Sequence, residues 1–168
     1  MRVLVRFKGV IADRVKGSTG NHNYHRIPSA VLAASTLAGY CSQVTVSCKE
    51  SPEKIRAFLL ATEQELKPWY PDCPLNADCR LTNGNLDSLI RKLNLDDIFI
   101  TSYEREAKIA SKRGITVFLI SEHKKGHIPN TGIYAVEKLS GVVSRINRLK
   151  GARVFLEKQY EVNPLDYI

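Results

Sequence analysis

The residues most able to do chemistry follow the predicted strands of this chain, where polar side chains come directly after apolar runs. Four such strand ends can be read in the sequence: Arg6-Phe7-Lys8-Gly9, Ser47-Cys48-Lys49, Thr101-Ser102-Tyr103 and Ser121-Glu122-His123. In an open parallel sheet, ligands bind beyond the carboxyl ends of the strands. We therefore expect these four segments to share one edge of the sheet and to form the functional site.

The first strand end carries two cations, Arg6 and Lys8, and they limit the chemistry open to it. Phosphoryl or acyl transfer through an aspartyl intermediate needs a carboxylate nucleophile and a second group that acts as acid and base. Arg6 stays protonated at any accessible pH, and Lys8 is a poor base unless it is strongly desolvated. Mg²⁺ prefers oxygen ligands, usually carboxylates, so two cations should repel it. We expect no catalytic residue, no metal and no cofactor here.

The same cations are suited to holding an anion. Guanidinium, ammonium, hydroxyl and backbone amide groups can bind a phosphate directly, in place of a metal. The candidate ligand-binding or phosphate-binding residues are Arg6, Lys8, Gly9, Ser47, Lys49 and Ser102. The alternative is that both cations face solvent or pair with acidic side chains, as charged residues near strand ends usually do. The candidate acidic partners are Asp13, Glu104 and Glu106.

Strand and helix patterns alternate along the chain. The expected strands are Val3–Ile11, Gln43–Cys48, Ala77–Thr82, Asp97–Thr101 and Ile115–Ser121. The expected helices are Pro28–Gly39, Pro52–Leu66, Leu86–Leu93, Glu104–Arg113 and Val136–Leu149. This alternation predicts the α/β class, with a doubly wound parallel sheet in a Rossmann-like three-layer α/β/α arrangement. We expect one domain over residues 1–150, and a tail over residues 151–168 that adds an edge strand or binds a partner.

Two further features of the sequence bear on partners and metals. The segment Val15–Arg26 is polar and contains two glycines, which predicts an exposed loop, and its length makes it a candidate lid or partner-binding loop. No two of the four cysteines have the two-residue gap of a zinc knuckle. We expect reduced structural thiols, with Cys73 and Cys79 placed so that they could clip a loop.

The opening motif resembles the signature of the haloacid dehalogenase-like (HAD-like) superfamily. That family begins with a strand that ends in Asp-x-Asp-Gly, often followed by an apolar pair and a further Asp. The matching stretch here is Arg6-Phe7-Lys8-Gly9-Val10-Ile11-Ala12-Asp13. It keeps Gly9 and Asp13 but has Arg6 and Lys8 where the two aspartates belong. The resemblance thus implies a degenerate member that lacks the catalytic aspartates.

Later motifs extend the resemblance over residues 2–149. Ser47 closes the second strand, as a Ser or Thr does in the family, and Thr101-Ser102 stands where the family has Gly-Asp. The helix that follows ends at Gly114 in the family's Ala-x-x-x-Gly pattern. The usual family lysine has no identifiable counterpart; the candidate substitutes are Arg80 and Lys92. The resemblance implies a HAD-like fold with no separate large cap domain.

Composition narrows the setting. The chain has 168 residues, 43% of them hydrophobic, which is enough to bury one core. No stretch approaches the apolar length of a membrane span or the pattern of a signal peptide, so we expect a soluble cytoplasmic protein without membrane contact. The formal net charge of +8 favours a nucleic acid or another phosphorylated partner, although a merely solvated basic surface is an alternative.

Three functions remain open from the sequence. The first is a catalytically inactive HAD-like protein that binds a polyanion, either nucleic acid or a phosphorylated ligand, or binds a protein partner through the tail. The second is an active HAD-like phosphatase or hydrolase with rewired residues, using Asp13 or a histidine. The third is a structural subunit of a larger assembly.

Overall fold

A computed structural model describes residues 1–14, 24–27, 30, 33–34, 36–37, 41–49, 51–68 and 79–146. Its strands are β1 (Arg2–Arg6), β2 (Ala12–Arg14), β3 (Tyr24–Arg26), β4 (Gln43–Ser47), β5 (Cys79–Thr82), β6 (Ile98–Thr101), β7 (Thr116–Ile120), β8 (Gly126–His127) and β9 (Ile133–Val136). Its helices are α2 (Pro52–Leu66), α4 (Leu86–Arg91) and α5 (Glu104–Ser111), with helical residues also at 30, 33–34 and 36–37 and at 139–146.

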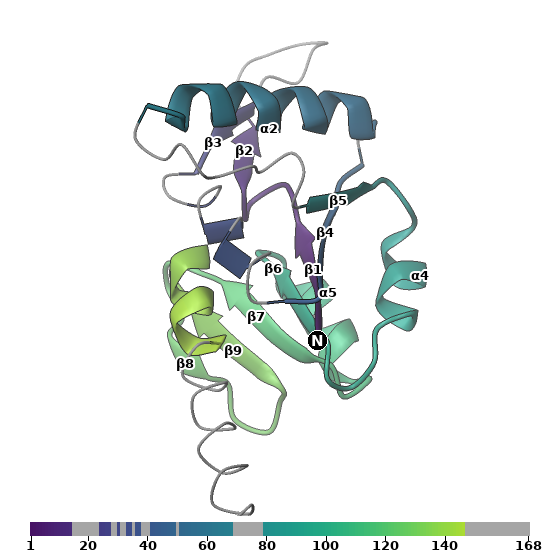
Figure 1. Cartoon of the computed structure of the whole chain (residues 1–168). Coiled ribbons are helices and arrows are strands. Elements are labelled where there is room, and N and C mark those ends of the chain that lie inside the picture. The colour runs from purple at the N-terminus through teal and green to yellow at the C-terminus, as the bar shows by residue number, and fades with distance from the viewer. Residues whose placement is uncertain are drawn as a thin grey trace, which may run out of the picture.

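Seven strands form the central sheet, in the order β5-β4-β1-β6-β7-β9-β8 (Figure 1). All neighbouring strands are parallel except the edge strand β8, which runs antiparallel to β9. β1 lies between β4 and β6, in register with β4 from Arg2 opposite Gln43 to Arg6 opposite Ser47. Because β1 is parallel to both of its neighbours, β4 and β6, the carboxyl ends of these three strands lie together. The mostly parallel sheet confirms the predicted α/β class.

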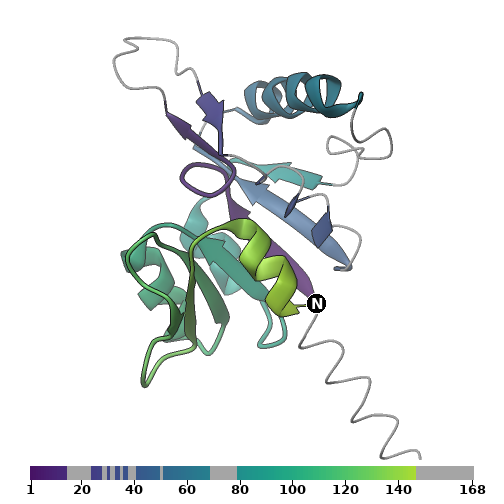
Figure 2. The ribbon, with the colours of Figure 1, turned by 90° about the vertical axis from the view of Figure 1, so that its left-hand side faces the viewer.

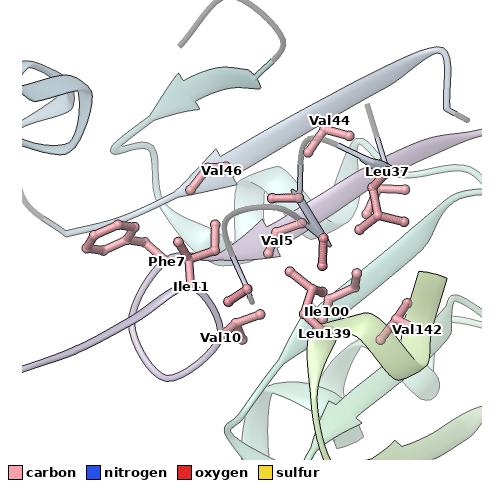
Figure 3. Close-up of a cluster of buried hydrophobic side chains, with 14 of the residues drawn as sticks. Val5, Phe7, Val10, Ile11, Leu37, Val44, Val46, Ile100, Leu139 and Val142 are labelled. Atoms are coloured by element: carbon pink, nitrogen blue, oxygen red, sulfur yellow. The ribbon is translucent and has the colours of Figure 1, made fainter. Parts of the chain in front are cut away.

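Alternate side chains along β1 pack into two apolar layers, one on each face of the sheet. Val3 and Val5 of β1 pack on one face with four described helical residues between 30 and 37, with α2 and with the helical residues 139–146; the four are Ala30, Ala33, Ala34 and Leu37. Leu4 of β1 packs on the opposite face with α4 and α5. Figure 3 shows part of the first layer, with the helical residues Leu37, Leu139 and Val142 drawn together with strand residues that include Val5 and Ile100. Because both faces are covered, β1, β6 and β7 are apolar at most of their positions.

Local chemistry explains where the helices start and stop. Pro52 begins α2 as its first residue, where a missing N–H costs nothing, and the preceding Ser51 makes no side-chain cap hydrogen bond. Asn85 caps α4, because its Oδ1 accepts hydrogen bonds from the backbone N–H groups of Asp87 and Ser88. Gly114 follows α5 with φ +77°, the left-handed conformation that a glycine adopts after a helix.

The first strand is shorter than predicted. The sequence predicts Val3–Ile11 as one strand, but β1 ends at Arg6 and the chain turns over residues 7–11. The carbonyl of Phe7 accepts hydrogen bonds from Ile11 N (2.9 Å) and Ala12 N (3.1 Å), so the backbone folds back on itself. Apolar residues there are buried in the turn rather than in a strand, which is why hydrophobicity alone was misleading.

After this turn, β2 and β3 pair as an antiparallel hairpin beyond the carboxyl end of the sheet, beside α2 (Figures 1 and 2). The sequence predicted a loop over Val15–Arg26, which is wrong for Tyr24–Arg26, the residues of β3. The rest of that loop, the tail over residues 151–168 and Cys73 lie outside the described residues.

The carboxyl-terminal helix also begins later than predicted. Val136 ends β9, and helical backbone starts at residue 139. The predicted loop after β7 contains the short edge strand β8. No helix among the described residues is long and apolar enough to cross a membrane. Within the same residues, nothing forms a separate cap domain.

Candidate functional site

The candidate site is the carboxyl edge of three neighbouring strands, β4, β1 and β6. β1 ends at Arg6, β4 ends at Ser47 and β6 ends at Thr101. Arg6 lies opposite Ser47 in the ladder, and the backbone N–H of Phe7 donates to the carbonyl of Ser47 at 2.9 Å. The predicted meeting of these strand ends is therefore seen in the structure.

Arg6 is a buried cation, with a relative exposure of 8%. Its Nη1 donates a long hydrogen bond to Ser47 Oγ (3.4 Å), and its Nε lies 3.2 Å from Glu106 Oε2. The second contact is an ion pair but not an aligned hydrogen bond, because Arg6 Nε has no hydrogen-bond partner among the described residues. One of the alternatives open from the sequence, the pairing of Arg6 with Glu106, is thus what the structure contains.

Glu106 is positioned by the end of β6 and the start of α5. The buried Thr101 hydroxyl donates to Glu106 Oε2 at 2.7 Å and accepts a hydrogen bond from the N–H of Tyr103 at 3.1 Å. Glu106 lies in the first turn of α5, where the helix dipole favours a negative charge. The Arg6–Glu106–Thr101 contacts therefore link β1, β6 and α5.

The turn after β1 fixes Gly9 and points Lys8 outward. Gly9 has φ +77°, and a Cβ placed on it would lie 2.1 Å from Ser102 Oγ. Only glycine fits this position, for both its conformation and its space. Lys8 is exposed. The structure thus brings Gly9 and Ser102 together, but it does not place Lys8 beside Arg6 in the buried part of the site.

An open cavity of about 520 Å³ adjoins Arg6. It is lined by the ends of β1, β4 and β5 and by the first turns of α4 and α5. Its charged lining residues are three cations and two anions, namely Arg6, Lys49, Arg105, Asp87 and Glu106. Lys49, a predicted ligand-binding residue, therefore shares a cavity with Arg6, whereas Lys8 and Ser102 do not line it.

Some lining residues were missed from the sequence. Asn83 and Gly84 follow β5, and Arg105 is in the first turn of α5. The four strand ends predicted to form the site do not include the end of the predicted strand Ala77–Thr82. Adding that strand end would have found Asn83 and Gly84, because β5 is parallel to β4.

Of the two candidates for the family lysine, Lys92 lies away from the candidate site, and Arg80 stays a prediction. Lys92 lies at the opposite, amino edge, where its carbonyl accepts a hydrogen bond from Arg2 Nη2 at 2.8 Å. Arg80 pairs with Thr45 in the sheet, and its side chain is outside the described residues. Lys92 as a substitute is therefore wrong.

The amino edge holds a second arginine pair. Asp97, 3% exposed, accepts hydrogen bonds from Arg2 N (2.7 Å), Arg2 Nε (2.9 Å), Arg2 Nη2 (2.5 Å) and Asn94 N (2.8 Å). Burial opposes the ionisation of Asp97, but the hydrogen bonds from Arg2 and Asn94 outweigh it and hold the pKa of this carboxyl below its ordinary value. As the sequence indicated, Asp97 lies at the amino ends of the strands, away from the candidate site.

The residues at the carboxyl edge do not fit a magnesium ion. Mg²⁺ prefers oxygen ligands, usually carboxylates, and the end of β1 carries the cations Arg6 and Lys8 instead. The acidic side chain in contact with Arg6, Glu106, is already engaged by Arg6 and Thr101. No group of three His, Cys, Asp or Glu residues within the described part of the chain is placed to hold a metal ion.

Comparison with known proteins supports the fold. No family model matches the sequence, and no curated protein matches it significantly. Among solved structures, the chain is similar to D,D-heptose 1,7-bisphosphate phosphatase from Burkholderia thailandensis, with a TM-score of 0.57 and 13% identity over 86% of this chain and 97% of that one. It is also similar to the enzyme of the same name from B. bronchiseptica, solved with magnesium and phosphate, with a TM-score of 0.55 and 14% identity over 88% and 98% of the two chains.

At this level of identity the likeness concerns the fold. The seven-stranded, mostly parallel sheet with helices on both faces is the architecture in which the two phosphatases match this chain over nearly their whole length. The chain therefore has the α/β fold of these two phosphatases.

Proposed function

We propose that this protein binds a phosphorylated ligand at the carboxyl edge of its sheet and does not hydrolyse it. The observation that carries the proposal is the buried guanidinium of Arg6 at the end of β1. The motif resemblance assigns this position to a catalytic aspartate, and Lys8 occupies the place of the second. A HAD-like fold with cations at both positions keeps the crevice without its nucleophile or its acid and base.

The chemistry of the site favours an anion. Arg6 presents a fork of donors that matches a phosphate, and hydrogen bonds between charged groups are about twice as strong as neutral ones. Ser47 Oγ lies 3.4 Å from Arg6 Nη1, and Lys49 lines the same cavity. A cavity of about 520 Å³ is in the range of small-ligand pockets. Because Arg6 is buried in a hollow, a small phosphomonoester fits it better than the rod of a nucleic acid.

The test separates binding from turnover. Phenyl phosphate with and without Mg²⁺ is incubated with the protein, and released phosphate is measured; binding of phenyl phosphate is measured by calorimetry. We expect saturable binding without metal and no release of phosphate. Arg6→Gln should weaken binding at least tenfold, because the principal cation is lost.

Two controls keep this test interpretable. Lys92→Gln removes one exposed positive charge from the opposite edge and should bind as the wild type does. Thermal unfolding of each variant checks that Arg6→Gln is folded. Magnesium-dependent turnover would refute the proposal, and so would binding that survives the loss of Arg6. Salt-sensitive oligonucleotide binding that outcompetes phenyl phosphate would favour a nucleic-acid partner instead.

A rewired phosphatase remains a second candidate because of one observation. Asp13 lies opposite His25 in the β2–β3 hairpin, so an acidic and a basic side chain share a position beyond the carboxyl edge. If phosphate is released, Asp13→Asn should abolish the release while leaving binding in place.

A further inference from the structure

The contact between Arg6 and Glu106 has the form of an occupied anion site. Arg6 is buried and needs an anionic partner, since a buried charge without one is strongly unfavourable. In the structure that partner is a carboxylate of the protein itself, with Glu106 Oε2 3.2 Å from Arg6 Nε. Both side chains line the cavity of about 520 Å³.

We propose that Glu106 is a resident counter-ion that a ligand's phosphate displaces from Arg6. This inference rests on the proposed function and adds a regulatory step to it: the protein's own carboxylate competes with the ligand. A phosphate would then bind Arg6 in exchange for the carboxylate, so the guanidinium is never left without an anion.

The geometry of the pair suits an exchange. Arg6 Nε is buried and makes no aligned hydrogen bond among the described residues, so the pair is held by charge without its best hydrogen bond. A ligand oxygen in line with that N–H would supply the missing bond. The side chain of Glu106 is also the more accessible partner, at 19% exposure against 10% for Arg6.

The carboxylate of Glu106 keeps other favourable interactions when it is displaced from Arg6. Thr101 Oγ1 donates to it at 2.7 Å, and the first turn of α5 favours its charge whether or not it contacts Arg6. The open cavity beside it gives the carboxylate access to water. Displacement therefore costs the ion pair but not every favourable interaction of Glu106.

The amino edge shows what a fixed arginine pair looks like in the same fold. Arg2 donates to Asp97 through N, Nε and Nη2, and the side chain of Asp97 is only 4% exposed. Both arginines line a cavity, of about 520 Å³ at Arg6 and about 270 Å³ at Arg2. The Arg6–Glu106 pair, however, has no aligned hydrogen bond at Arg6 Nε, whereas Arg2 donates to Asp97 through two side-chain nitrogens. The difference favours a displaceable role for Glu106 over a purely structural one.

The test uses inorganic phosphate as the probe and compares wild type, Glu106→Gln and Glu104→Gln by calorimetry. Gln at 106 keeps an acceptor for Thr101 but removes the competing charge, so phosphate should bind at least tenfold more tightly. Glu104→Gln is the matched control: it removes the same charge from the same helical turn, but its partner is the exposed Lys124. Its affinity for phosphate should stay within twofold of wild type.

A second measurement covers a loss of stability in Glu106→Gln. Phosphate should raise the melting temperature of this variant more than that of wild type, because the ligand supplies the missing anion. Equal phosphate affinity in wild type and Glu106→Gln would overturn the inference but leave the proposed function standing. Binding by Glu106→Gln alone would support the competition and overturn the proposed function. No binding by either protein would overturn both.

Discussion

Replacing Asp97 with Asn tests how strongly the amino edge clamps the first strand. Asp97 Oδ2 accepts hydrogen bonds from Arg2 Nε, Arg2 Nη2 and Asn94 N. An amide NH₂ in place of Oδ2 accepts none of them, and the carboxylate charge is lost. Three bonds at about 1 kcal/mol net each suggest a loss of about 3 kcal/mol, at the lower end of the 3–5 kcal/mol typical of a broken buried pair. The lower end applies because the Arg2 side chain is 39% exposed and regains water.

Urea unfolding at pH 7 measures this loss directly. For a domain of this size, about 3 kcal/mol also corresponds to a fall of roughly 9 °C in melting temperature. Asp96→Asn is the control, because it removes the same charge from the adjacent, exposed residue and should cost less than about 0.5 kcal/mol. A loss below about 1 kcal/mol for Asp97→Asn would refute the reasoning.

The pH dependence supplies an independent check. The folded protein holds the pKa of Asp97 below its ordinary value of 3.8, so the unfolded chain takes up a proton there first as the pH falls. The stability that Asp97 contributes is therefore fully present above about pH 4 and is lost as the pH falls through the lower, folded pKa. The difference in unfolding free energy between wild type and Asp97→Asn should shrink in that window. A difference that grows towards low pH would contradict the assignment.

Two further outcomes follow from the carboxyl edge. Gly9→Ala should lower the unfolding free energy by at least about 2 kcal/mol, because a left-handed conformation costs about 1–2 kcal/mol and the new Cβ meets Ser102 Oγ. The double variant Gly9→Ala with Ser102→Gly should regain only the part of this loss that is due to the steric clash. Full recovery of stability in the double variant would count against the conformational argument. Lys49→Gln should weaken phenyl phosphate binding about threefold to tenfold without changing the melting temperature, since Lys49 is exposed and lines the cavity; Lys54→Gln, an exposed lysine of α2, should leave binding unchanged, and equal effects of the two would indicate nonspecific charge.

Most helices and strands could be predicted from the sequence, because the hydrophobic periodicity and the proline and glycine residues at the element boundaries indicated the same elements. Pro52 starts a helix and Gly114 follows one, as predicted. The errors came where burial did not mean regular structure. Phe7 and Ile11 are fully buried but lie in a turn, and Tyr24 lies in a strand among polar residues. A short hairpin stabilised by contacts with distant segments leaves little local signal.

The position of the candidate site could be predicted from the strand order and direction, but the contacts of its side chains could not. Parallel strands bring their carboxyl ends together, so Arg6 and Ser47 could be placed side by side from the sequence. Side-chain direction could not be placed in the same way. Glu106 was one of three acidic candidates, and only the packing of α5 against the sheet selects it as the partner of Arg6. The neighbouring Glu104 contacts Lys124 instead, and this cation lowers the pKa of the Glu104 carboxyl.

The aromatic ring between the two cations has a consequence for the charge distribution. Phe7 is fully buried, with edge contacts to Tyr24 on β3 at 5.0 Å and to Phe58 on α2 at 5.3 Å between ring centroids. Phe7 is held by aromatic contacts on both sides, and its two neighbours in the sequence face opposite environments: the side chain of Arg6 is buried and that of Lys8 is exposed to solvent. The positive charges of Arg6 and Lys8, which have one residue between them, are thereby kept apart. The interior of the protein has to neutralise one positive charge instead of two.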